Sequence, residues 1–151
     1  LVLEKEKIDI LIIGDGNQKS LIINLIKRLN LQDYVTLKSY DPEWFRYLKF
    51  ASMFVSPSVI EGQPNVVLEA MAAKCPLIVS DIPAHRQILD DKSALIIPQN
   101  NINEFASAIL SLLENRELGL RRAKKAFLRL KKMSVESSAS KYKEVYLDIL
   151  K

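Results

Sequence analysis

Residues 53–79 read MFVSPSVIEGQPNVVLEAMAAKCPLIV. An apolar run at 53–55 ends at a Ser-Pro-Ser turn, and a second apolar run occupies residues 76–79. Short continuous apolar runs are typical of strands buried on both faces, and Pro64 suits the first position of a helix that lies between them. The segment therefore predicts a strand, a loop, a helix starting near Pro64 or Asn65, and a second strand, which is the repeating unit of a parallel sheet.

The rest of the chain continues this alternation. Apolar patterns predict further strands at 8–13, 35–37 and 94–97, and helices at 21–29, 41–50, 82–89, 103–113, 118–132 and from Val135 onward. Asp41 is expected to cap the 41–50 helix with Pro42 at its first position, and Ser134 to cap the last helix. We therefore expect an α/β fold, a Rossmann-like doubly wound parallel sheet with helices on both faces and a helical C-terminal tail.

Composition and cysteine content narrow the class. The 151 residues are 48% hydrophobic and 26% charged, which suits a single globular domain. No apolar run is long enough to cross a bilayer, and residues 1–7 mix acids and bases unlike a secretory leader. Cys75 is the only cysteine and is expected to be a small core residue. The expected location is cytoplasmic.

Positive charge is concentrated at the end of the chain. Residues 116–151 carry 11 Lys and Arg against 4 Asp and Glu, whereas residues 1–115 carry 11 against 14. A solvated helix face is the ordinary explanation for the cluster at 121–132. The alternative is contact with an anionic membrane surface, peripheral at the inner face. Nucleic acid is disfavoured as a partner because no aromatic platform accompanies the charge.

The loop of residues 56–65 carries the chemistry. It lies where a strand's carboxyl end passes into a helix, the place where doubly wound sheets bind ligands. Gly62 allows close approach of the backbone, and the following helix N-terminus can seat a pyrophosphate. Glu61 and Glu69 could both accept hydrogen bonds from the vicinal hydroxyls of a sugar or ribose. The alternative stays open that Glu61 is a solvated loop residue and Glu69 a surface residue.

The spacing Glu61, seven residues, Glu69 within SPSVIEGQPNVVLEAMAA closely resembles the E-x7-E signature of retaining glycosyltransferases of the family 4 type (group 1). The resemblance extends to residues 12–16, 76–81 and 94–98, in the same order. Such enzymes have the GT-B fold, and this chain resembles their C-terminal donor-binding domain. The implied activity is transfer of a sugar, with retention, from a UDP- or GDP-linked donor to a polysaccharide or lipid-linked acceptor of the cell envelope.

The resemblance also implies roles for individual residues. Glu61 would contact the transferred sugar as the catalytic residue, and Glu69 would contact the ribose. The segment that would hold the sugar and diphosphate comprises Gly62, Gln63, Pro64, Asn65 and Val66. Ser39 and Tyr40 would line the base pocket. No metal or other cofactor is expected besides the nucleotide sugar, and the sequence has no Asp-x-Asp pair of the kind that chelates a divalent ion.

Two parts of the family's architecture have no counterpart in residues 1–151. One is a strand-loop-helix unit before residue 8, with an arginine and a lysine that clamp the donor diphosphate. The other is the N-terminal acceptor domain, the expected partner of this one. The strand of that unit would lie centrally, between the strands at 8–13 and 53–55. We therefore expect the chain alone to be inactive, and its stability alone is in question. Gln63 and Lys74 also differ from the family pattern and are expected to tune the site.

Other interpretations are weaker. A non-catalytic nucleotide-sugar-binding module and an epimerase-like GT-B enzyme remain alternatives to transfer. Gly14 and Gly16 follow a strand, but Lys19 replaces the third glycine of a dinucleotide fingerprint, so a tight turn is preferred. His85 is the only histidine and has no nucleophile pattern beside it, so we expect it to be structural or to lie behind the site.

Overall fold

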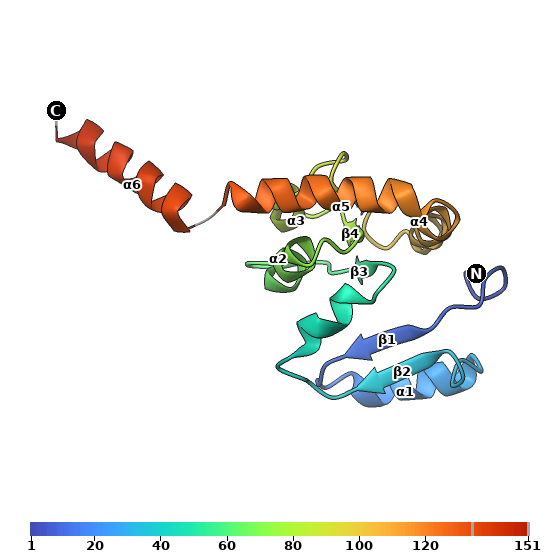
Figure 1. Ribbon diagram of the computed structural model, residues 1–151. Helices are drawn as coiled ribbons and strands as arrows, with labels where there is room; N and C mark the ends of the chain where they lie inside the picture. Colours follow the sequence, from blue (N-terminus) through green and yellow to red (C-terminus); the bar gives the residue numbers. More distant parts are fainter. Residues whose placement is uncertain (134, 151) are drawn as a thin grey trace.

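The computed structural model describes residues 1–133 and 135–150. Figure 1 shows its elements in chain order: β1 (Ile10–Ile13), α1 (Lys19–Arg28), β2 (Val35–Lys38), the 3-10 helix η1 (Trp44–Lys49), β3 (Phe54–Ser56), α2 (Asn65–Ala72), β4 (Leu77–Ser80), α3 (Pro83–Ile88), β5 (Leu95–Ile97), α4 (Ile102–Glu114), α5 (Arg116–Lys131) and α6 (Val135–Ile149). The predicted alternation of strands and helices is confirmed. Ser134, the predicted cap of the last helix, lies outside the described residues.

The strands form two parallel sheets. One contains β1 and β2, with Ile12 opposite Leu37. The other has the order β3-β4-β5, with Val55 opposite Ile78 and Val79 opposite Ile96. In the part of the chain that the structure describes, no strand ladder joins β1 to β3. The strands of the predicted doubly wound sheet thus form two separate ladders, with the break between β1 and β3.

Strand β4 is the centre of the core. All four of its residues are buried, and successive side chains of a strand point to opposite faces of the sheet. Leu77 and Val79 belong to the cluster that includes Met71 of α2 and Ala126 of α5. Ile78 belongs to a second cluster, with Leu112 of α4. Helices therefore cover both faces of this sheet, and each buried aliphatic side chain contributes about 1.5–3 kcal/mol to stability.

Helix α5 is attached to the sheet by arginines as well as by its apolar face. Arg122 donates to the carbonyl oxygens of Ala94, at 2.9 Å, and of Asp91. Arg129 donates from Nε to the Ile88 carbonyl at 3.0 Å and from Nη1 to the Asp90 carboxylate at 2.8 Å. Two of the cluster's basic residues are therefore structural, because they bind the connection between α3 and β5.

The predicted start of the 41–50 helix is wrong. Residues 41–43 form a turn, and the helix that follows is a 3-10 helix beginning at Trp44. The Asp41 carboxylate accepts from the Glu43 amide at 2.9 Å, within the turn. Since this Asx-turn uses the carboxylate two residues onward, Asp41 does not cap the helix and Pro42 is not in its first turn.

The unit β1-α1-β2 is open to solvent. The strand predicted at 8–13 is present but begins at Ile10, and its predicted burial is wrong: Leu11 is 40% exposed and none of the β1 residues is buried. Helix α1 also has no buried residue, and Leu21 is 65% exposed. These apolar side chains lack the covering layer that a strand buried on both faces requires.

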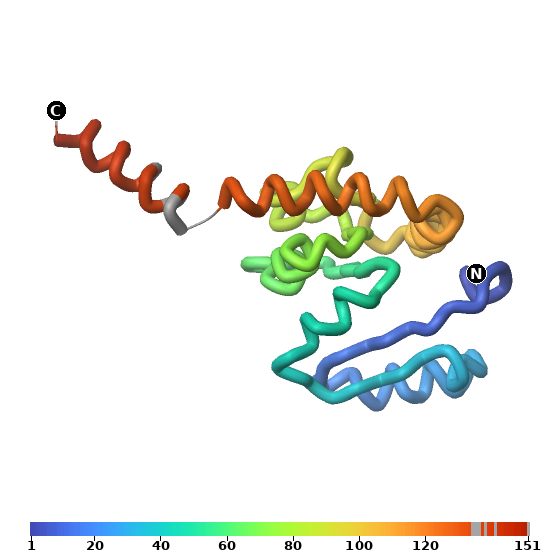
Figure 2. The backbone as a smooth tube through the Cα atoms, viewed as in Figure 1, coloured from blue at the N-terminus to red at the C-terminus, as the bar shows by residue number. Residues whose placement is uncertain are grey.

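Helix α6 projects away from the rest of the molecule (Figure 2). Tyr142, Tyr146 and Ile149 lie on its exposed surface, each at least 65% accessible. These apolar side chains of α6 are thus uncovered among the described residues.

Candidate functional site

The loop between β3 and α2 is shaped by its ends. Ser56 closes β3 and is buried, and Pro64 is buried at the N-cap position of α2. The Pro64 carbonyl accepts from the amides of Val67 at 3.0 Å and Leu68 at 3.1 Å, so the first turn begins where the sequence places it. The intervening residues are thereby held as a short arch at the carboxyl end of the sheet.

The amides of this arch are not all available to a ligand. The Asn65 amide donates to the Gln63 carbonyl at 2.9 Å, and those of Val67 and Leu68 donate to Pro64. Among the described residues, the amides of Gly62, Gln63 and Val66, close to the start of α2, have no acceptor, and neither have those of residues 58–61. Gly62 faces open space, since a Cβ built on it would meet nothing within 4 Å. An anion can therefore be bound by these three amides, a narrower set than the whole first turn.

The two predicted carboxylates have different surroundings. Glu61 is half-buried and accepts a hydrogen bond from the Ser58 hydroxyl at 2.7 Å. Glu69 is exposed on α2. Glu61 is thus a fixed group rather than a freely solvated loop residue, whereas the position of Glu69 suits either a ligand contact or an ordinary surface role.

Ser39 and Tyr40 lie in a second loop, after β2. The Lys19 ammonium donates to the Ser39 hydroxyl at 2.9 Å and to the Asp15 carboxylate at 2.6 Å. The Tyr40 amide donates to the same carboxylate at 2.7 Å. Hydrogen bonds from Lys19 and from the Tyr40 backbone lower the pKa of Asp15 below its ordinary value.

Sequence reasoning missed Asp15 and Lys19 as organisers of the second loop. The turn depends on Gly14, whose φ of 149° lies in a region that favours glycine. The available signal was an Asp between two glycines directly after a strand, with a lysine four residues later. We interpreted that pattern only as a turn.

The structure forms two separate groups of predicted site residues. The described contacts connect Asp15, Lys19, Ser39 and Tyr40 with one another, and the loop 56–65 with its own neighbours. The ends of β1 and β2 and the loop after β3 lie toward the same side of the molecule (Figure 1). The two groups belong to different sheets, so their separation depends on how those sheets are joined.

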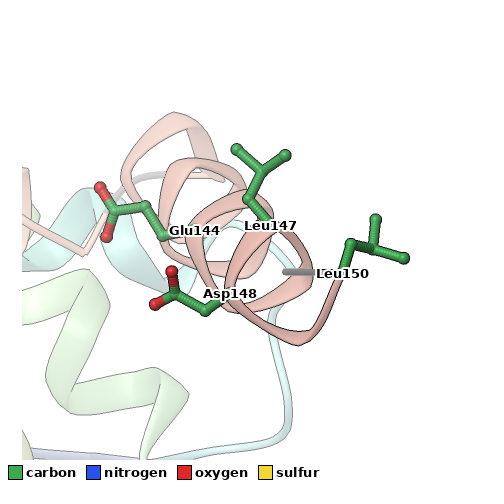
Figure 3. Close-up of a pocket in the computed structure, with 4 residues that line it drawn as sticks. All are labelled: Glu144, Leu147, Asp148 and Leu150. Carbon is green, nitrogen blue, oxygen red and sulfur yellow. The ribbon is translucent and has the colours of Figure 1, made fainter.

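A hollow elsewhere does not compete for this role. It lies on α6 and is lined by Glu144, Leu147, Asp148 and Leu150. Figure 3 shows the two carboxylates on one side of the helix and the two leucines pointing away from them. Because all four side chains come from one helical segment, they form an open surface that cannot enclose a small ligand.

The remaining candidates are buried. Burial raises the pKa of the Cys75 thiol to about 11, so a reactive thiolate is disfavoured and the predicted core role is confirmed. His85 is fully buried on α3, and its Nδ1 lies 2.8 Å from the Ser80 carbonyl oxygen. This placement confirms the prediction that His85 is structural or lies behind the site.

Residues 1–133 and 135–150 contain no helix of the length and hydrophobicity that a membrane span needs. They also contain no group of three or more His, Cys, Asp or Glu residues placed to hold a metal ion.

Comparison with known proteins decides the family. The profile described as "Glycosyl transferases group 1" matches residues 1–129. The chain belongs to this family. It is 30% identical over 143 residues to the Campylobacter jejuni N-acetylgalactosamine-N,N'-diacetylbacillosaminyl-diphospho-undecaprenol 4-alpha-N-acetylgalactosaminyltransferase. It is 33% identical over 138 residues to the Staphylococcus aureus poly(ribitol-phosphate) alpha-N-acetylglucosaminyltransferase. The predicted resemblance is therefore confirmed.

The chain spans a minor part of these relatives. The matches cover 91% and 89% of this chain, but 39% and 28% of the two transferases. Among solved structures, the crystal structure of TarM superposes with a TM-score of 0.87 at 32% identity, covering 96% of this chain and 30% of that one. The group 1 glycosyl transferase fold is thus shown over almost the whole chain.

Proposed function

We propose that the chain is the nucleotide-sugar-binding domain of a retaining glycosyltransferase. The observation that carries the proposal is the arch after β3, which contains amides without acceptors and, next to them in the sequence, the Glu61 carboxylate held by Ser58. Amides suit a diphosphate and a carboxylate suits sugar hydroxyls, so one short loop offers both recognition chemistries. Family membership favours transfer over the alternatives of a non-catalytic module or an epimerase.

The proposed roles follow the two loops. Glu61 contacts the transferred sugar, Glu69 accepts from the ribose hydroxyls, and residues 62–66 hold the sugar and diphosphate. Ser39 and Tyr40 line the base pocket, held in place by Lys19 and Asp15. As the family resemblance implies, no metal or other cofactor takes part, so activity should be unchanged by a chelator.

A uridine diphosphate sugar is the favoured donor class. A mutant of Staphylococcus aureus TarM was solved in complex with UDP, and it shares 32% identity with this chain. A structure of Anabaena HepE in complex with UDP-glucose matches with a TM-score of 0.80 at 16% identity. An identity this low supports a shared fold only. UDP therefore comes before GDP in a donor screen.

The working enzyme is proposed to contain more than these residues. A strand inserted between β1 and β3 would pair with both and join the two sheets into one. It would also bring the loop of Ser39 and Tyr40 and the arch into a single site. Acceptor contacts are assigned to a further domain, because the named relatives are longer. Their names mention an undecaprenol-linked saccharide and poly(ribitol phosphate), so a lipid-linked or polymeric acceptor is proposed.

We also propose peripheral contact with an anionic membrane surface at the cytoplasmic face, through one face of α5. Its exposed or partly exposed residues are Leu120, Arg121, Lys124, Lys125, Leu128, Lys131 and Lys132. They recur every three or four residues, with Lys132 directly after the end of α5, so five cations and two leucines share one stripe. Glu117 lies on the same face and pairs with Arg121 at 3.4 Å. Arg122 and Arg129 are excluded from the stripe because they bind the loop before β5.

Donor binding tests the central proposal. The whole protein is titrated by calorimetry with UDP, GDP, ADP and their common sugar conjugates. We expect selective binding of a uridine nucleotide, weakened about tenfold or more in Glu61→Gln and Glu69→Gln, since each loses a charged acceptor. Glu114→Gln, exposed at the end of α4, is the matched control. Unchanged binding in both site variants would exclude this site.

The membrane proposal has its own test. Cosedimentation with phosphatidylglycerol-containing vesicles is compared with pure phosphatidylcholine vesicles. Reversing Lys124 and Lys125 to Glu should weaken binding about tenfold or more, since each basic residue contributes about 1 kcal/mol. Lys5→Glu with Lys7→Glu is the control of equal charge change. If both double variants lost vesicle binding equally, net charge alone would be the cause and the proposed face of α5 would be wrong.

A further inference from the structure

The Glu61 carboxylate is the last acceptor of a hydrogen-bonded series. Ser58 Oγ donates to Glu61 Oε1 at 2.7 Å. The Ser80 hydroxyl, buried at the end of β4, donates to the Ser58 carbonyl oxygen. His85 Nδ1 lies 2.8 Å from the Ser80 carbonyl and 3.4 Å from its hydroxyl oxygen. The arch is thus connected to the centre of the core.

The directions of these bonds follow from the acceptors. A carboxylate and a carbonyl only accept, so the single protons of Ser58 and Ser80 point to Glu61 and to Ser58. The Ser80 carbonyl likewise requires the proton on Nδ1 of His85. Ser56 Oγ, 3.3 Å from Ser58 Oγ, then supplies its own proton to that oxygen. No hydroxyl in the series has a free choice of partner, which limits the motion of the three serines, although His85 Nε2 is buried without a partner among the described residues.

The arch has a second attachment from the neighbouring strand. Gln99, which follows β5, donates from Nε2 to the Val59 carbonyl at 2.9 Å. Two successive carbonyls, of Ser58 and Val59, are therefore held from the ends of β4 and β5. Two adjacent bonds of this kind fix the direction in which the chain enters Glu61.

We propose that Ser58, supported by Ser80, is the positioning residue that sets the orientation of the Glu61 carboxylate for transfer. This inference rests on the proposed function of Glu61. A donated hydrogen bond to one oxygen fixes the rotation of the carboxylate plane and leaves the other oxygen for the substrate. Ser58 acts through Glu61 and makes no contact of its own with the donor. Gln99 is exposed, and its contribution is the smaller.

The test separates turnover from binding in the whole protein. Release of UDP from UDP-N-acetylglucosamine, UDP-glucose and UDP-galactose is measured as kcat and KM for whichever is turned over, acceptor absent. Ser58→Ala should lower kcat about 10-fold to 100-fold, the effect of one hydrogen bond to a charged group, with KM within about twofold. Ser58→Thr keeps the hydroxyl and should recover most of the rate. Ser80→Ala should show the same pattern more weakly.

The control is Ser111→Ala, which removes a hydroxyl that donates to the Ala108 carbonyl at 2.8 Å on α4. It should leave both constants unchanged at a similar melting temperature. Raised KM with unchanged kcat in Ser58→Ala would overturn the inference, because it would make Ser58 a donor ligand. Equal loss in Ser58→Thr and Ser58→Ala would also overturn it. Glu61→Gln distinguishes failure of the positioning role from failure of the proposed function. If Glu61→Gln abolishes UDP release and Ser58→Ala does not lower it, the proposed function stands and the positioning role is wrong. If Glu61→Gln is fully active, both fall.

Discussion

Strands β1 and β4 have similar aliphatic patterns and very different surroundings. Strand β1 reads Ile-Leu-Ile-Ile, and β4 has three aliphatic residues followed by a serine, Leu-Ile-Val-Ser. Strand β4 pairs on both edges and is covered by helices on both faces, so every residue is buried. Strand β1 pairs only with β2, and Leu11 and Ile12 are exposed. In the described chain, every buried residue lies between 48 and 126.

The difference separates two kinds of information in a sequence. An apolar run determines that a segment forms a strand, which is a local property. Burial is a property of the neighbours, and β1 has only one strand beside it. A sequence of the buried type in an exposed position is therefore evidence for a further covering element. This is the physical basis for proposing a strand between β1 and β3.

The largest expected effect compares leucines in the two sheets. Leu77→Ala should reduce the free energy of unfolding by about 2–5 kcal/mol, because Leu77 is buried in the core cluster. Leu11→Ala should cost about 1 kcal/mol in the 151-residue chain, because Leu11 is already 40% exposed. Urea unfolding followed by circular dichroism gives both values.

The same pair can sharpen the comparison in the whole protein. If a further strand covers β1 there, the cost of Leu11→Ala should rise toward that of Leu77→Ala. A cost that stays small in both contexts would show that β1 remains uncovered and would contradict the inserted strand.

Arginines of α5 provide an intermediate effect. Arg129→Ala should reduce stability by about 1–2 kcal/mol, since it removes bonds to the Ile88 carbonyl and the Asp90 carboxylate at a partly exposed site. Arg121→Ala, which loses only an exposed pair with Glu117, should change it by less than about 0.5 kcal/mol. Thermal and urea unfolding of the two variants give this difference. Equal effects would mean that α5 is held by its apolar face alone.

A smaller effect concerns how the free energy of unfolding falls at acidic pH. The Ser93 hydroxyl is the main cause that lowers the pKa of Asp90, with Arg129 and two backbone amides adding to it. A lowered folded-state pKa gives stability that is present above the unfolded value, near 4, and is lost as the pH falls through the folded value. Ser93→Ala should raise the pKa of Asp90 and weaken that loss.

Carboxyl titration by NMR checks this expectation. Asp15, whose pKa is lowered by Lys19 and the Tyr40 amide in the other sheet, is the internal reference and should not move. If the pKa values of both carboxyls shifted in Ser93→Ala, the change would reflect the whole fold and not one hydroxyl.

Sequence reasoning predicted much of the fold and part of the site. Periodicity identified the strands and the main helices, because these depend on local spacing. It was wrong at Asp41, where a turn and a cap use the same residue types and only the observed bond to Glu43 decides between them. It singled out Glu61 but neither Ser58, which lies three residues earlier in the same loop, nor Ser80, whose hydroxyl reaches the Ser58 carbonyl from the end of β4. The bond from Ser80 joins residues far apart in the sequence, and such a bond has no spacing signature.

The smallest expected effect concerns the exposed face of α1. Leu21→Ala should change the stability of the 151-residue chain by less than about 0.5 kcal/mol, because the side chain is mostly hydrated and alanine is at least as good a helix former. Leu112→Ala, buried on α4, is the matched variant and should cost about 2–5 kcal/mol. Urea unfolding of both variants is repeated in the whole protein. A cost of Leu21→Ala that appears only there would place a covering element on α1 as well as beside β1, and would extend the missing layer from a single strand to a strand with its helix.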